Sequence, residues 1–138
     1  MKILLDTDFL IALSKDDDSN HKKAEKIAEN SKKEQIFITS FTIPEATTVL
    51  SYKVSQNTAK DFLGEARKRK FIEIPLSVIL AELTDQIFIA QNKSRTSWID
   101  CLNVAVVQIH KLDGILSFDK FYQKQGIKNF TRSISKEA

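Results

Sequence analysis

The sequence of 138 residues is 42% hydrophobic and 28% charged, a composition typical of one ordinary soluble domain. Its 21 basic and 18 acidic residues give a net charge of +3, which permits an anionic partner such as a nucleic acid without requiring one. Three widely spaced glycines exclude the glycine-rich loops that bind dinucleotides or nucleoside triphosphates. A single cysteine and two histidines exclude an intramolecular disulfide and a closed zinc site of Cys and His.

The uncharged stretches of the chain are at most ten residues long, whereas a membrane-spanning helix needs about 20 apolar residues. Asp6 and Asp8 interrupt the apolar run near the N-terminus, which argues against a secretory signal peptide. The lone cysteine fits a reducing compartment. We therefore expect a cytoplasmic protein without a membrane segment.

The first half of the chain alternates short apolar runs with amphipathic segments. Strands are predicted over residues 2–5, 35–39 and 71–74. Helices are predicted over residues 9–13, 21–33, 43–54 and 57–70, with Pro44 at a favoured first-turn position and Asn57 as the cap of the last one. The helix over 21–33 is rich in lysine and glutamate, so its His21 is predicted to be a surface residue.

The second half repeats this alternation, beginning with a helix predicted over residues 78–92. The next helix starts at Ser97 and is apolar all round, with no formal charge between Asp100 and Lys111, which predicts a central, buried helix. A fourth strand is predicted over residues 114–118 and a fifth over 127–131. We expect a single domain over residues 1–132 and a frayed tail over 133–138.

Strands that alternate with helices predict an α/β fold, in which a parallel sheet of four to five strands has helices on both faces. In such folds the strand ends and the helix starts lie at the same edge of the sheet, because every right-handed crossover leaves a strand at its carboxyl end. Ligands bind at that edge.

Four acidic residues fall at this carboxyl edge. Asp6 and Asp119 follow predicted strands, while Glu45 and Asp100 lie in the first turns of predicted helices. Residues far apart in the sequence are therefore candidates for a single acidic pocket, with Asp8 beside them.

Each acid also has a structural interpretation as a helix or turn cap, and Ser97 with Asp100 matches a capping box. Capping alone gives no reason for several carboxylates to converge beside a buried helix, where repulsion and desolvation oppose ionisation. A divalent cation removes that penalty. Oxygen ligands without histidine or cysteine suit a hard ion such as Mg²⁺ or Mn²⁺.

Four segments resemble, in order and spacing, the acidic motifs of PIN-domain ribonucleases, and the similarity is closest to toxins of the VapC type. These segments are Ile3-Leu4-Leu5-Asp6-Thr7, Ile43-Pro44-Glu45-Ala46, Trp98-Ile99-Asp100-Cys101-Leu102 and Ile115-Leu116-Ser117-Phe118-Asp119. The resemblance implies a three-layer parallel α/β sandwich. It also implies an endoribonuclease that requires Mg²⁺ or Mn²⁺, hydrolyses RNA phosphodiester bonds and leaves a 5′-phosphate.

Carried over residue by residue, the resemblance implies that the catalytic, metal-binding acids are Asp6, Glu45, Asp100 and Asp119. Ser117 matches an auxiliary hydroxyl residue. The resemblance further implies a small antitoxin protein as partner and a homodimer.

Two positions depart from the family pattern. Asp8 stands where the family often has Asn or Ser, and its role is open between an added ligand and a helix cap. No acid follows Asp119 within three residues, although many members have one there. We therefore hypothesise that the protein alone binds one metal ion and that a second binds only when RNA is present.

Five basic residues lie near the acidic edge by sequence position and are predicted to contact RNA phosphates: Lys15, Lys53, Lys93, Arg95 and Lys120. The competing hypothesis is a catalytically silent PIN-like module that binds RNA or a protein. A phosphoacceptor receiver domain is disfavoured, because it needs an acid at the end of the third strand, where Ile74 and Pro75 stand.

Overall fold

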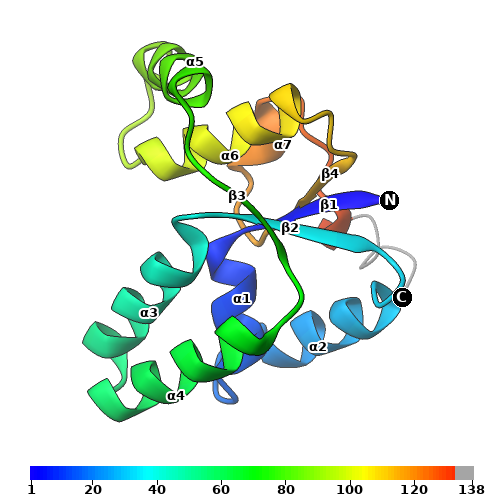
Figure 1. The fold of residues 1–138 in the computed structure, drawn as a ribbon, viewed down its shortest axis with the longest axis vertical. Helices are drawn as coiled ribbons and strands as arrows, with labels where there is room; N and C mark the ends of the chain where they lie inside the picture. The colour runs from blue at the N-terminus through cyan, green and yellow to red at the C-terminus, as the bar shows by residue number, and fades with distance from the viewer. Residues whose placement is uncertain (133–138) are drawn as a thin grey trace.

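Four parallel strands form a single sheet in the computed structural model, which describes residues 1–132 (Figure 1). The strand order is β3-β2-β1-β4, built from β1 (Lys2–Leu5), β2 (Gln35–Thr39), β3 (Ile72–Ile74) and β4 (Gly114–Leu116). In the central strand β1, Ile3 pairs with Ile36 of β2 on one side and with Gly114 of β4 on the other. The predicted parallel α/β fold is confirmed.

Helices cover both faces of this sheet and complete three layers (Figure 1). Successive residues of a strand point to opposite faces, so Ile3 and Leu5 join one hydrophobic core while Leu4 joins the other. The first core is covered by α1 (Thr7–Ser14), α2 (His21–Asn30), α3 (Thr42–Lys53) and α4 (Gln56–Lys68). The second is covered by α5 (Val78–Ile89), α6 (Trp98–Ile109) and α7 (Phe121–Lys124).

Helix α6 is buried through its middle, as its apolar sequence predicts. All seven residues from 101 to 107 are buried, and α5 packs against this helix. Burial of each large apolar side chain contributes about 1.5–3 kcal/mol. The end of the helix differs from the prediction, because Ile109 is 41% exposed.

The predicted fifth strand over residues 127–131 is not a strand. Asn129 forms only an isolated parallel bridge with Ile115, and a helical turn begins at Phe130. This segment passes so close to β4 that a Cβ on Gly114 would lie 2.4 Å from the carbonyl oxygen of Lys128. That oxygen accepts a hydrogen bond from the backbone of Ile115 at 2.9 Å, which fastens the segment to the sheet edge without a strand.

Several predicted helix boundaries also differ. Helix α4 is capped by Ser55 rather than Asn57, because the extended backbone of Ser55 lets its hydroxyl accept the N–H of Thr58 at 3.0 Å. Helices α2 and α5 end at Asn30 and Ile89, each three residues before the predicted end. The predicted tail over 133–138 lies outside the described residues.

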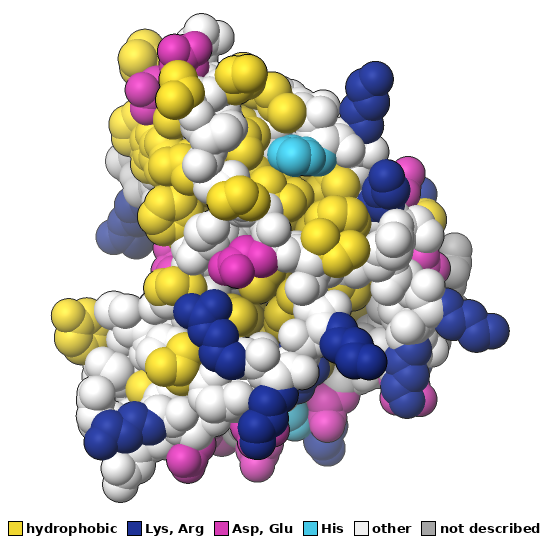
Figure 2. All heavy atoms as spheres, viewed as in Figure 1, with side chains coloured by type: hydrophobic (Ala, Val, Ile, Leu, Met, Phe, Trp, Pro, Cys, Tyr) yellow, Lys and Arg dark blue, Asp and Glu magenta, His cyan; other side chains and the backbone are white. Residues whose placement is uncertain are grey.

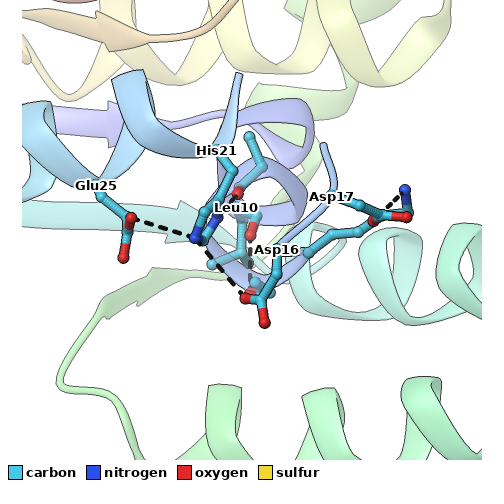
Figure 3. A network of polar contacts seen from close by, with 8 residues as sticks. Leu10, Asp16, Asp17, His21 and Glu25 are labelled. Carbon is cyan, nitrogen blue, oxygen red and sulfur yellow. Dashed lines mark hydrogen bonds and ion pairs between the residues drawn. The ribbon is translucent and has the colours of Figure 1, made fainter. Parts of the chain in front are cut away.

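His21 is not a surface residue as predicted, and only 14% of its side chain is exposed. Its Nδ1 lies 2.7 Å from the carbonyl oxygen of Ala12 in α1. Its Nε2 lies 3.2 Å from the carboxylate of Glu25 and 3.7 Å from that of Asp16 (Figure 3). His21 therefore fastens the first two helices together. The amphipathic pattern of α2 did not indicate this, because one partner is a backbone oxygen of another helix.

Hydrophobic side chains gather on the surface over α5 and α6, whereas lysine and arginine predominate over the region of α4 (Figure 2). The most exposed apolar residues of α5 are Val78 at 74%, Ile79 at 65% and Ile89 at 80%. Contiguous exposed apolar side chains are typical of protein-binding surfaces. Within residues 1–132, no helix is both long and apolar enough to cross a membrane.

Candidate active site

Asp6 lies at the centre of the candidate site, where β1 ends and α1 begins. It caps α1, since its Oδ1 accepts the N–H of Thr7 at 2.8 Å. The residue is only 6% exposed. The predicted capping role is therefore confirmed, and the same geometry fixes a carboxylate at the carboxyl edge of the sheet.

Ser117 joins this carboxylate to the end of β4. Its buried hydroxyl donates to Oδ2 of Asp6 at 2.7 Å and accepts the N–H of Asp119 at 3.0 Å. Asp8 lies beside the same turn, where its two oxygens are 3.3 and 3.2 Å from the N–H of Phe118. Asp6, Asp8 and Asp119 are thus brought together as the sequence predicts, with Ser117 between them.

Asn103 and Tyr122 complete the site, and sequence reasoning missed both. The amide nitrogen of Asn103 donates to Oδ1 of Asp6 at 3.1 Å and to the hydroxyl of Tyr122 at 3.0 Å. That hydroxyl donates to Oδ1 of Asp100 at 3.3 Å. Both residues are at least 98% buried, and Oδ1 of Asn103 has no hydrogen-bond partner among the described residues. A signal for Asn103 was available, because it is the single polar residue in the buried stretch 101–107.

Asp100 takes part in the predicted capping box of α6. Its N–H donates to the hydroxyl of Ser97 at 3.0 Å, and its Oδ2 accepts the N–H of Ser97 at 3.2 Å. Capping and membership of the acidic cluster are therefore not exclusive. The cap holds one oxygen of Asp100 while the other faces Tyr122.

Glu45 lies in the first turn of α3, at the expected edge of the sheet. No hydrogen bond or ion pair within residues 1–132 joins its side chain to Asp6, Asp8, Asp100 or Asp119. Its place in the site therefore stays a prediction from its position. Here "aspartate cluster" denotes Asp6, Asp8, Asp100 and Asp119.

Three members of the aspartate cluster have raised pKa values. Burial, followed by the charges of Asp8 and Asp100, raises the pKa of Asp6 well above its ordinary range. Burial is the main cause that raises the pKa of Asp8 to about 6, and Asp119 adds to it. Burial and the charge of Asp119 also raise the pKa of Asp100. Several carboxylates that oppose one another's charge form a setting in which a cation stabilises all of them.

The donor set of the aspartate cluster is made of oxygen atoms alone, which fits a hard ion such as Mg²⁺ or Mn²⁺. The side chains as placed do not form a ready-made metal cluster, since within residues 1–132 no group of three or more His, Cys, Asp or Glu is arranged to hold an ion. Instead, N–H and O–H groups of the protein donate hydrogen bonds to these carboxylates. Each carboxylate oxygen has two lone pairs. Oδ1 of Asp6 uses both, for Thr7 and Asn103, whereas its Oδ2 accepts from Ser117 and keeps one lone pair for an ion.

Two clefts open at the aspartate cluster. One, of about 280 Å³, is lined by Asp100 and Asp119 together with the predicted RNA contacts Lys93, Arg95 and Lys120. The other, of about 360 Å³, is lined by Asp8 together with the predicted contacts Lys15 and Lys53. All five basic residues selected from the sequence therefore line a cleft that also contains an acid of the cluster. Lys124, in the first cleft, was missed.

A parallel sheet with helices on both faces and aspartates gathered at its carboxyl edge defines an α/β protein with an acidic edge site. The sequence identifies the family: the profile of the PIN domain matches residues 3–127, and the chain belongs to the PIN domain family. The resemblance inferred from the motifs is confirmed. No curated protein matches the sequence significantly.

Solved structures share this fold. The VapC20 toxin of Mycobacterium tuberculosis, described as cleaving the sarcin-ricin loop, superposes with a TM-score of 0.81 at 18% identity, over 91% of this chain and 96% of that one. VapBC2 of Rickettsia felis, bound to a DNA fragment from its promoter, superposes with a TM-score of 0.68 at 12% identity, over 90% of this chain and 92% of that one. A toxin–antitoxin complex from Klebsiella pneumoniae superposes with a TM-score of 0.58 at 20% identity, over 85% of this chain and 86% of that one.

Proposed function

We propose that this protein is a divalent-metal-dependent endoribonuclease and the toxin of a toxin–antitoxin pair. The observation that carries the proposal is the convergence of Asp8, Asp100 and Asp119 on the buried Asp6, from three separate segments of the chain. Membership of the PIN domain family and likeness to toxin structures support it.

The residues of the site are held in place before any substrate binds. Asp6 receives three donors, from Thr7, Ser117 and Asn103, so its carboxylate has one orientation. The backbone N–H of Phe121 fixes Asp119 at 2.9 Å. Such fixed groups do not have to reorganise when the reaction begins, which is a main source of catalytic rate.

The aspartate cluster would hold the ion, with Glu45 as a further candidate ligand by position. A bound Mg²⁺ or Mn²⁺ would lower the pKa of a water molecule and polarise a phosphoryl oxygen of the RNA. The cations of the two flanking clefts would position the strand through its phosphates. Hydrolysis of a phosphodiester bond with a 5′-phosphate product is the reaction that the family resemblance implies.

An antitoxin protein is the proposed partner. Two of the similar structures are toxin–antitoxin complexes, which supports the assignment. The exposed apolar residues of α5 offer a surface for a protein partner or for the proposed homodimer. Light scattering of the purified chain, alone and after co-expression with a candidate antitoxin, tests both assemblies.

The experiment for the nuclease uses purified protein freed of any partner and total cellular RNA, with Mn²⁺, Mg²⁺ or EDTA. We expect discrete fragments with either metal and none with EDTA. Asp6→Asn should abolish them, whereas Asp61→Asn, on the exposed face of α4, should not.

The competing function is a silent binding module, and one observation favours it. Asp6 and Asp100 both cap helices, so they have structural roles that need no catalysis. No cleavage with any metal, from a folded protein that still binds RNA, would support this module in place of the nuclease.

A further inference from the structure

The cleft between the α5–α6 loop and the start of α7 combines positive charge with an aromatic ring. Its basic residues are Lys93 and Arg95 from the loop, and Lys120 and Lys124 from the other wall, where Phe121 also lies. We propose that this cleft is a nucleotide subsite, which binds the phosphate next to the scissile one and stacks its base on Phe121. The proposal rests on the proposed nuclease function and names how the substrate is held.

The four cations of this subsite have no ion-pair partner within residues 1–132. Asp100 and Asp119 line the same cleft, yet none of the four basic groups reaches them within 4.0 Å. The four cations outnumber the two carboxylates that line this cleft, and positive charge in a concave surface attracts a polyanion because its field is focused there. This excess of positive charge suits the phosphates of a nucleic-acid strand.

Lys93 and Arg95 of the α5–α6 loop both line this cleft. The hydroxyl of Thr96 donates to the carbonyl oxygen of Lys93 at 3.1 Å, which closes the loop on itself. Arg95 has a φ of 71°, in the left-handed region that non-glycine residues rarely adopt. Lys93 and Arg95 line the same cleft as Asp100.

Phe121 is tied to the aspartate cluster through its neighbour. Its ring lies edge-on to the ring of Tyr122, with centroids 5.3 Å apart and an angle of 73° between the planes. The hydroxyl of Tyr122 contacts Asp100. A base on Phe121 would therefore be positioned relative to the acids. Aromatic rings beside basic side chains are the usual means of binding unpaired nucleotides.

The second cleft does not offer the same combination. Lys15 is already paired with Asp17 at 2.8 Å. The remaining lining of that cleft includes Ile11, Val49 and Val54, and no aromatic residue. We therefore expect phosphate contact on both sides of the cut and base stacking on one side only. The subsite itself has a volume of about 280 Å³.

The test measures binding of the full chain, in EDTA, to a fluorescent RNA of twelve uridines and to an abasic strand of equal length and charge. The cleft variants are Lys93→Gln with Arg95→Gln, Lys120→Gln with Lys124→Gln, and Phe121→Leu. The matched control is Lys26→Gln with Lys60→Gln, which removes two exposed charges from α2 and α4. Circular dichroism and thermal unfolding confirm that each variant is folded.

We expect each cleft pair to weaken binding about tenfold and to reduce the slope of log Kd against log salt by about 0.7 per lost phosphate contact, with no change for the control pair. Phe121→Leu should weaken binding of the uridine strand at least fivefold, leave the salt slope unchanged and leave binding of the abasic strand unchanged. Equal salt slopes for the cleft and control pairs would overturn the phosphate subsite. Equal losses of both strands in Phe121→Leu would overturn base stacking.

Cleavage by the same variants separates this inference from the proposed function. If the wild-type chain cuts RNA and the cleft variants cut and bind equally well, the subsite is wrong and the nuclease stands. If the wild-type chain cuts no RNA but the cleft variants lose binding, the subsite stands and the nuclease is wrong. A wild-type chain that binds neither strand overturns the subsite, whereas the nuclease is decided by cleavage alone.

Discussion

The side-chain amide of Asn103 donates a hydrogen bond to Asp6 across 97 positions of sequence, at 3.1 Å. The second proton of the same amide reaches the hydroxyl of Tyr122, which in turn donates to Asp100. Two acids of the cluster are thus joined through two buried residues. We regard Asn103 and Tyr122 as positioning residues, because they act through the carboxylates.

Tyr122→Phe tests this connection. The substitution keeps the ring but leaves one proton of Asn103 and one oxygen of Asp100 without the hydroxyl. The loss of a buried partner costs about 1–3 kcal/mol of unfolding free energy. Cleavage should fall about tenfold, and not completely, because Ser97 still holds Asp100. Urea denaturation and single-turnover cleavage measure the two effects, with Tyr52→Phe, at an 85% exposed position, as the neutral control.

Asp8→Asn should change how stability depends on pH. The raised pKa of Asp8, about 6, means that the folded state holds this proton more tightly than the unfolded state, whose carboxyl titrates near 3.8. Stability therefore falls as pH rises from about 4 to about 6, and the penalty is complete above pH 6. In EDTA the variant should be more stable than wild type by about 1–3 kcal/mol at pH 7.5, with the difference vanishing near pH 4. A difference that grew as the pH fell would contradict this.

Divalent ions should stabilise the folded protein. An ion that binds only the folded state at 100 times its Kd adds about 2.7 kcal/mol, so Mn²⁺ should raise the melting temperature by several degrees at pH 7.5. Asp6→Asn should lose most of this shift, and Asp61→Asn should keep it. An equal shift in both variants would mean that the ion binds elsewhere.

Gly114→Ala should destabilise the protein, because the new Cβ would collide with the backbone at Lys128 and with the ring of Phe130. Overpacking of this kind costs about 1–3 kcal/mol. Gly64→Ala is the matched control, since a Cβ there meets no atom of residues 1–132 within 4 Å. The control lies inside α4 and should gain about 0.5–1 kcal/mol. Thermal unfolding of the two variants should therefore shift in opposite directions.

The placement of the acids could be predicted from the sequence because a parallel α/β fold fixes which edge each strand end reaches. Asp6, Asp100 and Asp119 needed only the alternation of strands and helices to be assigned to one edge. The companions of Asp6 could not be assigned in the same way. Tyr122 resembles an ordinary core aromatic, and its contact with Asn103 depends on how α6 and α7 pack.

Two further differences between the sequence-based predictions and the structure also arise from tertiary contacts. His21 is held by the carbonyl oxygen of Ala12, an acceptor that no side-chain pattern shows. The predicted fifth strand has suitable apolar residues, but its one bridge, at Asn129, leads directly into a helical turn. Glu45 is placed at the right edge by its helix, yet its side-chain contacts with the cluster stay a prediction.

The most direct test of the central claim is the single-turnover rate at which one mapped RNA is cut in Mn²⁺ by wild type, Asp6→Asn and Asp61→Asn. If the aspartate cluster is the catalytic centre, Asp6→Asn loses at least a thousandfold in rate while remaining folded, and Asp61→Asn matches wild type. Equal rates for Asp6→Asn and wild type would contradict the account, because the carboxylate at the centre of the cluster would then have no part in the reaction.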